Sequence, residues 1–452
     1  MECHRQKNHV TPMLEANLKI IEELKLFVSL IKEQPEALSL FSTVKNAFTR
    51  TRKLPFERLV LLIAKLCKKT LSIEIDDFFE ELSDSSPCSV SAFAQGRMKL
   101  NPVFFLMWNQ LLGCCFYHYY KDQVKRWRGY RLIAGDGSNI SLINTPVLQN
   151  YFGGQSNQLG SFVQAKVFYC YDVLNEIVLF PQIKPYRFGE VMMAYKNMDN
   201  LEEDMLMIYD RLHCSYKMIA LHLWQERENK FVIRGNESQL FVQEFIASEK
   251  KSTIAYLKPT PYAVKGLKES GYKIDKNTLL KVRMVRVNLE SSVEVLITNL
   301  WEEEGYATTE FKDLYFKRWG IETNIDHQKN ILRLESFSGL TVQSVEQDFF
   351  ATAFMANLHA ILIKESQTIV DETHTHRKHP VKINKNKSYG KLRKYIVALF
   401  ISRKPQDILR LLNTYFIRDP IIIRKGRSFK RRVKNKQCKS KHKTYMNYKP
   451  AF

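Results

Sequence analysis

The sequence predicts an α/β fold, in which helices cover a mixed β-sheet and an all-helical segment comes first. Apolar residues recur at helical spacing over the N-terminal quarter of the chain, with a break at Pro35, and again over 392–416, with a break near Pro405. From Tyr130 onward, strand-like runs alternate with helical stretches, which is typical of a sheet with helices on its faces. Three more strand-like runs follow one another between residues 252 and 300. We therefore expect a helical N-terminal domain at 1–125, an α/β domain at 126–365 with a β-rich insertion at about 238–305, and a basic C-terminal region at 366–452.

The charge of the chain indicates a polyanionic partner. The 452 residues have an ordinary hydrophobic content of 45% but a net charge of +22. Nucleic acid suits this charge better than a membrane surface, because no basic amphipathic anchor is evident. The tail at 421–452 holds twelve Lys or Arg and no Asp or Glu, and such a run binds phosphates without reading sequence. A basic protein from a Lys-rich proteome would show a similar charge.

Cysteine usage and hydropathy indicate a reducing, cytosolic setting. The eight Cys include no CxxC pair, so neither a zinc site nor a disulfide framework is indicated. The first ten residues are mostly polar and charged, unlike a signal peptide. The stretch Asn101–Tyr120 has no Lys, Arg, Asp or Glu and is long enough to span a membrane. Asn109, Gln110 and His118 interrupt it, so we expect a buried helix and no membrane partner.

The N-terminal domain contains a helix-turn-helix pattern. Amphipathic stretches at 56–69 and 71–82 are followed by a turn and by a short helix that Ser89 can cap. Three polar residues of that last helix are in a position to contact bases in the major groove of DNA: Gln95, Arg97 and Lys99. We therefore expect residues 1–125 to form a DNA-binding domain, although short helix pairs of this kind are also common as purely structural elements.

Three carboxylates in the α/β region are candidates for one site. Asp136 lies in the first strand-like region, which we interpret as two strands with a turn near Gly137–Asn139. Asp210 ends the short apolar strand that begins at Met205, and Glu322 lies in a helical stretch. Two acids at strand positions and one on a packed helix can converge on a pair of divalent cations. Taken singly, a turn Asp before Gly and a strand-end Asp are commonplace.

The helical stretch Glu310–Arg333 carries the most specific pattern in the chain. On a continuous helix, four of its residues fall within about a 60° arc: Tyr315, Arg318, Glu322 and Lys329. An acid flanked by cations on one helix face suits a metal ion beside a phosphate. A solvated face with helical ion pairs is the alternative interpretation.

The spacing Tyr-x2-Arg-x3-Glu-x6-Lys and the run Arg318–Glu322 (RWGIE) resemble the signature of the insertion sequence 4 family of DDE transposases. Asp136-Gly137-Ser138 and Asp210-Arg211 are similar to the contexts of that family's two catalytic Asp residues. The resemblance covers roughly residues 90–450. It implies a ribonuclease-H-like core in which Asp136, Asp210 and Glu322 are catalytic and bind two Mg²⁺ ions, with Mn²⁺ as a substitute.

The same resemblance implies cut-and-paste transposition of an insertion sequence. DNA would be cleaved at the element ends and the freed 3′ ends joined to target DNA. Tyr315, Arg318 and Lys329 would bind DNA phosphates near the cleavage point. The implied partners are double-stranded DNA, as terminal inverted repeats and target, and a second copy of the chain on paired ends. The implied location is the bacterial cytoplasm, in association with the nucleoid.

Two other interpretations stay open on sequence grounds. One is a catalytically inactive DNA-binding protein derived from a transposase, and the other is a ribonuclease-H-fold nuclease without strand transfer. A DNA-binding protein has no physical need for three converging acids, which would repel one another and the phosphate. The nuclease shares the metal site, and only an assay separates it from a transposase.

Overall fold

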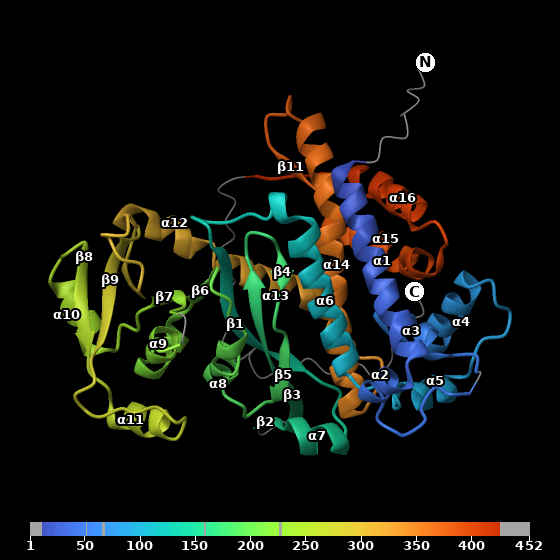
Figure 1. The fold of residues 1–452 in the computed structure, drawn as a ribbon, viewed down its shortest axis with the longest axis horizontal. Coiled ribbons are helices and arrows are strands. Elements are labelled where there is room, and N and C mark those ends of the chain that lie inside the picture. The colour runs from blue at the N-terminus through green and yellow to red at the C-terminus, as the bar shows by residue number, and fades with distance from the viewer. Residues whose placement is uncertain (1–10, 51, 66–67, 158–159, 226–227, 425–452) are drawn as a thin grey trace. The chain divides into compact units, whose positions relative to one another are not determined.

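The computed structural model describes residues 11–50, 52–65, 68–157, 160–225 and 228–424, and Figure 1 labels its helices and strands. The chain divides into two compact units, which are discontinuous in sequence. The helical unit comprises Met1–Val124, Ile140–Ala165 and His327–Phe452, and the sheet unit comprises Lys125–Asn139 and Lys166–Asp326. This partition differs from the three consecutive domains expected from sequence, whose roles remain predictions. Of the basic tail, residues 425–452 lie outside the described ranges.

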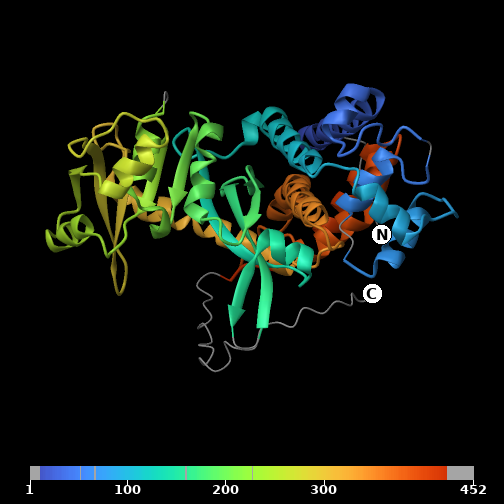
Figure 2. The same cartoon turned by 90° about the horizontal axis from the view of Figure 1, so that it is seen from below.

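A long buried helix, α14 (Val342–Thr373), forms the centre of the helical unit. Helices that pack against it include α1 (Pro12–Glu33), α3 (Phe56–Ala64), α6 (Val103–Tyr119) and α16 (Pro405–Ile417); Figures 1 and 2 show α6 beside it. Trp108 of α6 stacks on Phe354 of α14 with ring centroids 4.0 Å apart. The unit also contains α2 (Pro35–Leu40), α4 (Leu71–Glu81), α5 (Val90–Arg97), α7 (Pro146–Phe152), α15 (Lys385–Ile401) and the strands β2 (Gly154–Asn157), β11 (Val381–Lys382) and β12 (Ile421–Ile422).

Several sequence predictions for this unit are confirmed. Pro35 begins α2 directly after α1, and Pro405 begins α16, because a proline is tolerated in the first helical turn but not further in. The apolar stretch at 101–120 forms the buried helix α6. Within the described part of the chain, no helix is both long and apolar enough to cross a membrane.

The major-groove interpretation of α5 is wrong for Arg97. Its side chain is buried and forms an ion pair with Asp348 at 2.9 Å. The same guanidinium donates to Gln347 Oε1 at 2.9 Å and to Ser338 Oγ at 2.7 Å. These partners belong to or precede α14, so Arg97 fastens α5 to the core of its unit. Gln95 and Lys99 are exposed.

A mixed sheet forms the second unit. Strands in the order β3-β1-β6-β7-β10-β9-β8 lie side by side. Pairing is parallel from β1 to β6 and from β6 to β7, and antiparallel from β7 through β10 and β9 to β8. The bounds are β1 (Arg131–Ser141), β3 (Gly160–Asp172), β6 (Met205–Tyr209), β7 (Lys230–Arg234), β8 (Ser252–Leu257), β9 (Leu280–Asn288) and β10 (Val293–Thr298), with β4 (Ile177–Val178) and β5 (Gln182–Pro185) also paired to β3.

Helix α12 (Phe311–Phe316) packs on the sheet and so positions the signature segment. Its buried residues Phe311 and Leu314 join a hydrophobic cluster with Leu206, Ile208 and other inward-facing strand residues. Leu206 and Ile208 are two positions apart and therefore project from the same face of β6. The other helices that begin in this unit are α8 (Glu190–Tyr195), α9 (Tyr216–Leu223), α10 (Leu240–Ala247), α11 (Pro261–Lys268) and α13 (Trp319–Asn330).

The structure differs from the sequence predictions at two strand regions. The expected turn near Gly137–Asn139 is absent from the described strand, because β1 runs without a break from Arg131 to Ser141. The β-rich stretch between 252 and 300 forms strands as expected, but the sequence did not predict that they join the central sheet. β10 pairs with β7, with Ile297 opposite Ile233, and extends that sheet.

The signature stretch is not one continuous helix. It divides into α12 and α13 at Lys317–Arg318. Here the backbone bonds tighten to three-residue spacing, with Arg318 N–H donating to Tyr315 O at 3.0 Å and Ile321 N–H to Arg318 O at 3.0 Å. A 3₁₀-like turn has about three residues per turn, so it changes which side chains share a face. The prediction that the four signature residues share one face of a single continuous helix is therefore wrong in detail.

Candidate active site

Two neighbouring parallel strands bring Asp136 and Asp210 together. In the register of β1 with β6, Gly135 lies opposite Tyr209. Asp136 follows Gly135 and Asp210 follows Tyr209, so the two acids lie side by side where β6 ends. Gly135 is required for this approach, since a Cβ atom there would lie 2.5 Å from the Tyr209 ring. The two acids that the sequence places at strand positions are thereby brought close together.

A fourth carboxylate, Glu190, lies beside Asp136. The Gly137 N–H donates to Glu190 Oε1 at 2.9 Å and to Asp136 Oδ1 at 2.8 Å. Glu190 Oε2 lies 3.7 Å from Lys166 Nζ. A Cβ atom on residue 137 would lie 2.6 Å from Glu190 Cδ and 2.9 Å from the Val167 carbonyl oxygen. The glycine after Asp136 thus allows Glu190 to approach.

Asp210 is held by groups that follow it in sequence. Its Oδ1 accepts from the Leu212 N–H at 3.0 Å and lies 2.9 Å from Nδ1 of His213, a fully buried histidine. This arrangement caps the short turn Arg211–His213. The carboxylate of Asp210 is consequently fixed in direction by its own loop.

Arg318 lies between the carboxylates from the sheet and the one on α13. Its Nη2 donates to Glu322 Oε1 at 2.8 Å, and its Nη1 lies 3.9 Å from Asp136 Oδ2. The guanidinium also lies 5.6 Å from the ring centroids of both Tyr315 and Trp319, close enough for cation–π attraction. The Arg318 side chain is only 8% exposed, so its charge is poorly screened by solvent.

The two strand-end acids have opposite electrostatic settings. Burial and the charge of Glu190 raise the pKa of Asp136 to about 7. Asp210 adds to this rise, and Arg318 opposes it. Burial also disfavours ionisation of Asp210, but the hydrogen bond and charge of His213 outweigh it and lower the pKa of Asp210. At neutral pH one acid is readily protonated while its neighbour stays ionised.

Tyr315 is a buried phenol beside Arg318. Burial raises its pKa to about 12, and the positive charge of Arg318 opposes this rise. The hydroxyl therefore keeps its proton at neutral pH and is available as a hydrogen-bond donor. Lys329 is half-buried near the end of α13, within the stretch that belongs to the helical unit.

The carboxylates have the chemistry that a divalent cation of the Mg²⁺ or Mn²⁺ type needs. Their donors are oxygen atoms, and a cation would offset the like charges that raise the pKa of Asp136. In the described residues, no three His, Cys, Asp or Glu side chains stand ready to hold a metal. The guanidinium of Arg318 instead pairs with Glu322. The residues fit a metal by donor type and charge, without forming a ready-made cage.

The sheet unit thus contains Asp136, Asp210, Glu322, Tyr315 and Arg318, which the sequence analysis had singled out. Sequence reasoning missed Glu190 and His213. Glu190 follows a glycine at the start of α8, and His213 comes three residues after Asp210. Neither signal is specific, because a Glu in a first helical turn and a His near an Asp are frequent.

Comparisons with known proteins give little further information. No protein-family model matches the sequence, and no curated protein matches it. A solved structure, described as the cryo-EM structure of a piggyBac transposase synaptic complex with hairpin DNA, aligns with a TM-score of 0.40 at 11% identity. The alignment covers 98% of this chain and 92% of that one. A match of this size does not define a shared fold.

We expect the stability of Asp136→Asn relative to the wild type to increase as the pH rises. A carboxyl with a raised folded-state pKa contributes stability below its unfolded pKa, near 4, and loses that contribution as the pH passes about 7. The variant minus wild-type difference in unfolding free energy should grow by about 2–4 kcal/mol over this range. Urea unfolding in metal-free buffer measures it, and a difference that does not vary with pH would contradict the raised pKa.

The contact between residues 137 and 190 is testable by a double-mutant cycle. Gly137→Ala should cost about 1–3 kcal/mol of unfolding free energy, because the new methyl group meets Glu190 and a carbonyl oxygen. Glu190→Ala removes part of that collision, so the two costs should be non-additive by about 1 kcal/mol. Gly113→Ala, where nothing lies within 4 Å of the added atom, is the matched control. Additive costs would show that Glu190 and Gly137 do not meet.

Proposed function

We propose that this protein is a DDE transposase that cleaves double-stranded DNA at the ends of an insertion sequence and joins them to a target. One observation carries the proposal. The acids predicted from the transposase signature and its two Asp motifs come from three distant segments. Yet one buried guanidinium, that of Arg318, donates to Glu322, lies 3.9 Å from Asp136 Oδ2 and exerts a weaker electrostatic effect on Asp210. Unrelated surface acids have no reason to share one buried guanidinium.

The strand arrangement supports a ribonuclease-H-like core. Asp136 is on β1, and Asp210 directly follows the parallel neighbour β6. Glu322 reaches the same site from α13, which follows the sheet-packed helix α12. One acid within a strand, one at the end of its parallel neighbour and one on a packed helix can converge on divalent cations, as catalysis by such a core needs.

In the proposed mechanism, Asp136, Asp210 and Glu322 would hold Mg²⁺ or Mn²⁺, and the cation would supply an activated nucleophile and neutralise charge on the scissile phosphate. Arg318 positions that phosphate, because a planar guanidinium binds phosphate oxygens in pairs. Tyr315 donates a hydrogen bond from its neutral phenol. The Gly137 N–H and Glu190 keep the backbone after Asp136 in place.

The Arg318–Glu322 contact has a specific role in this proposal. It neutralises Glu322 in the DNA-free protein. Bound DNA would offer the guanidinium a phosphate oxygen in place of this carboxylate, and Glu322 would then be able to serve as a cation ligand. Both groups remain paired before and after the exchange, so neither is left as an isolated charge. Lys329 and a second copy of the chain would also contact DNA.

Glu322→Gln should abolish DNA cleavage and preserve binding. The amide keeps the shape and can still accept from Arg318, but it removes the charge that holds a cation. We expect a loss of at least about 100-fold in cleavage rate, measured with Mg²⁺ and with EDTA on a duplex that carries the element's ends. Asp313→Asn, at an exposed acid of α12, is the control and should cleave normally.

The products of that assay separate the proposal from its alternatives. Hairpin or joined products identify a transposase, whereas nicked products alone identify a nuclease without strand transfer. Salt-sensitive binding without cutting by the wild type identifies an inactive DNA-binding derivative. Cleavage by Glu322→Gln at the wild-type rate would contradict the assignment of the three acids.

Arg318→Lys and Arg318→Ala distinguish phosphate positioning from a structural role. Lysine keeps the charge but cannot form paired bonds to phosphate, so we expect cleavage per folded molecule to fall at least about tenfold for Lys and further for Ala. Calorimetric unfolding gives the folded fraction. Normal cleavage per folded molecule in both variants would show that Arg318 only supports the fold.

A further inference from the structure

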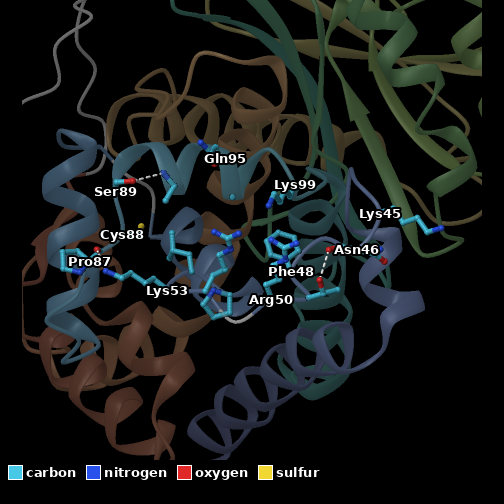
Figure 3. A pocket seen from close by; sticks show the side chains of 16 residues that line it. Lys45, Asn46, Phe48, Arg50, Lys53, Pro87, Cys88, Ser89, Gln95 and Lys99 are labelled. Carbon is cyan, nitrogen blue, oxygen red and sulfur yellow. Dashed lines mark hydrogen bonds between the residues drawn. The ribbon is translucent and has the colours of Figure 1, made fainter.

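A basic groove lies in the helical unit, apart from the residues assigned to catalysis. It has a volume of about 730 Å³ and is lined by residues from a first segment, 45–50 and 52–55, and from a second segment, 87–99, which includes α5. Figure 3 shows its labelled cations, with Lys45, Arg50 and Lys53 contributed by the first segment and Lys99 by the second. A volume of this size accommodates a segment of a polymeric ligand such as a few nucleotides.

The groove is uniformly positive. Its cations are Lys45, Arg50, Arg52, Lys53 and Lys99, all exposed, and no Asp or Glu lines it. Within the described ranges no ion pair is recorded for any of the five. Asp84 is close enough for Lys53 to help lower its pKa, but hydrogen bonds from Ser86 and Arg58 act more strongly on that carboxylate. Five cations without counter-charges repel one another, so an anionic ligand would relieve the cost of gathering them.

The backbone holds the groove in shape. Asn46 and Phe48 adopt left-handed conformations with φ of 57° and 60°, which non-glycine residues keep only when the surroundings enforce them. The Phe48 ring packs on Phe56 at 5.6 Å between centroids. Thr43 N–H donates to Lys99 O at 3.0 Å, and Lys53 Nζ donates to Pro87 O at 3.2 Å. Both walls are thus tied together, and a ligand would meet a preformed surface.

The lining suits phosphates better than base edges. It consists of five cations, three of them lysines, together with small and apolar residues and the amides of Asn46 and Gln95. The guanidinium of α5 that could read a guanine, Arg97, is turned inward to Asp348. Contacts to phosphates position DNA but carry no sequence information.

We propose that this groove binds the phosphate backbone of duplex DNA without reading its sequence. This inference rests on the proposed function, because it names a DNA contact of the same protein. The concave shape and the preformed walls favour a polymer strand over a flat membrane, and the chain's net charge of +22 favours nucleic acid over a neutral ligand. The groove would hold DNA whichever sequence lies there, while other parts of the protein select the cleavage site.

The test removes three groove cations in the full-length chain: Arg50→Gln, Lys53→Gln and Lys99→Gln. The matched control removes one Arg and two Lys that are equally exposed in the same unit: Lys378→Gln, Arg403→Gln and Lys404→Gln. Two unrelated 30-base-pair duplexes serve as probes over a range of salt concentrations. All six positions are exposed, so the melting temperature should not change in either variant.

We expect the groove variant to lose affinity by about 10- to 100-fold for both duplexes alike, and its salt dependence to weaken by about two to three in log–log slope. The control should bind as the wild type does. An unchanged slope, an equal loss in the control, or a loss confined to one duplex would overturn the proposal. The proposal would also be overturned if the wild type bound phosphatidylserine vesicles as tightly as DNA and the groove variant lost affinity for both by the same factor.

The cleavage assay with Glu322→Gln separates this inference from the proposed function. If the wild type binds DNA through the groove but never cleaves it, the result supports the groove assignment and contradicts the proposed transposase activity. If the groove variant binds and cleaves normally, the activity stands and the groove assignment fails.

Discussion

A single buried guanidinium, that of Arg318, holds the candidate site together. Asp136, Glu190 and Asp210 gather at one place on the sheet, where burial first, and then the like charges of Glu190 and Asp210, raise the pKa of Asp136. Arg318 supplies the positive charge that makes this gathering tolerable, and it pairs with Glu322 on the other side. Removing one partner of such a buried pair leaves an uncompensated charge, which is far costlier than the pair itself.

Two glycines make the close packing around that charge possible. Gly135 lets β1 lie against the Tyr209 ring, and Gly137 lets Glu190 reach the backbone beside Asp136. Close packing against Glu190, and not a turn, therefore explains why the Asp-Gly-Ser motif has a glycine at position 137. The sheet provides a rigid edge, and the turn between α12 and α13 delivers Arg318 to it. The chemistry proposed for this site needs both, because acids and guanidinium must be fixed before a phosphate arrives.

Local signals predicted much of this arrangement. The strand that ends at Asp210, the helix capped by Ser89 and the breaks at Pro35 and Pro405 follow from periodicity and capping rules that act over a few residues. The spacing from Tyr315 to Glu322 also led to residues that the structure brings together.

Long-range contacts account for what the sequence did not reveal. The burial of Arg97 depends on Asp348, which is 251 residues away, and no local pattern encodes that pairing. Glu190 is 53 residues from the Gly137 N–H that it accepts from. The join of β10 to β7 is likewise a tertiary event. The break at Lys317–Arg318 is subtler, since one tightened turn between two helices is too short to leave a clear change in the hydrophobic pattern of the sequence.

The central claim is that Asp136, Asp210 and Glu322 form one cation site. In the absence of DNA, the positive charge of Arg318 takes the place of the cation in this site. Anomalous difference density from crystals grown with Mn²⁺ and a DNA duplex tests it most directly. The account predicts Mn²⁺ among these three carboxylates, with the Arg318 guanidinium moved from Glu322 to a phosphate oxygen. Ordered Mn²⁺ elsewhere on the protein, with Arg318 still paired to Glu322 beside bound DNA, would contradict it.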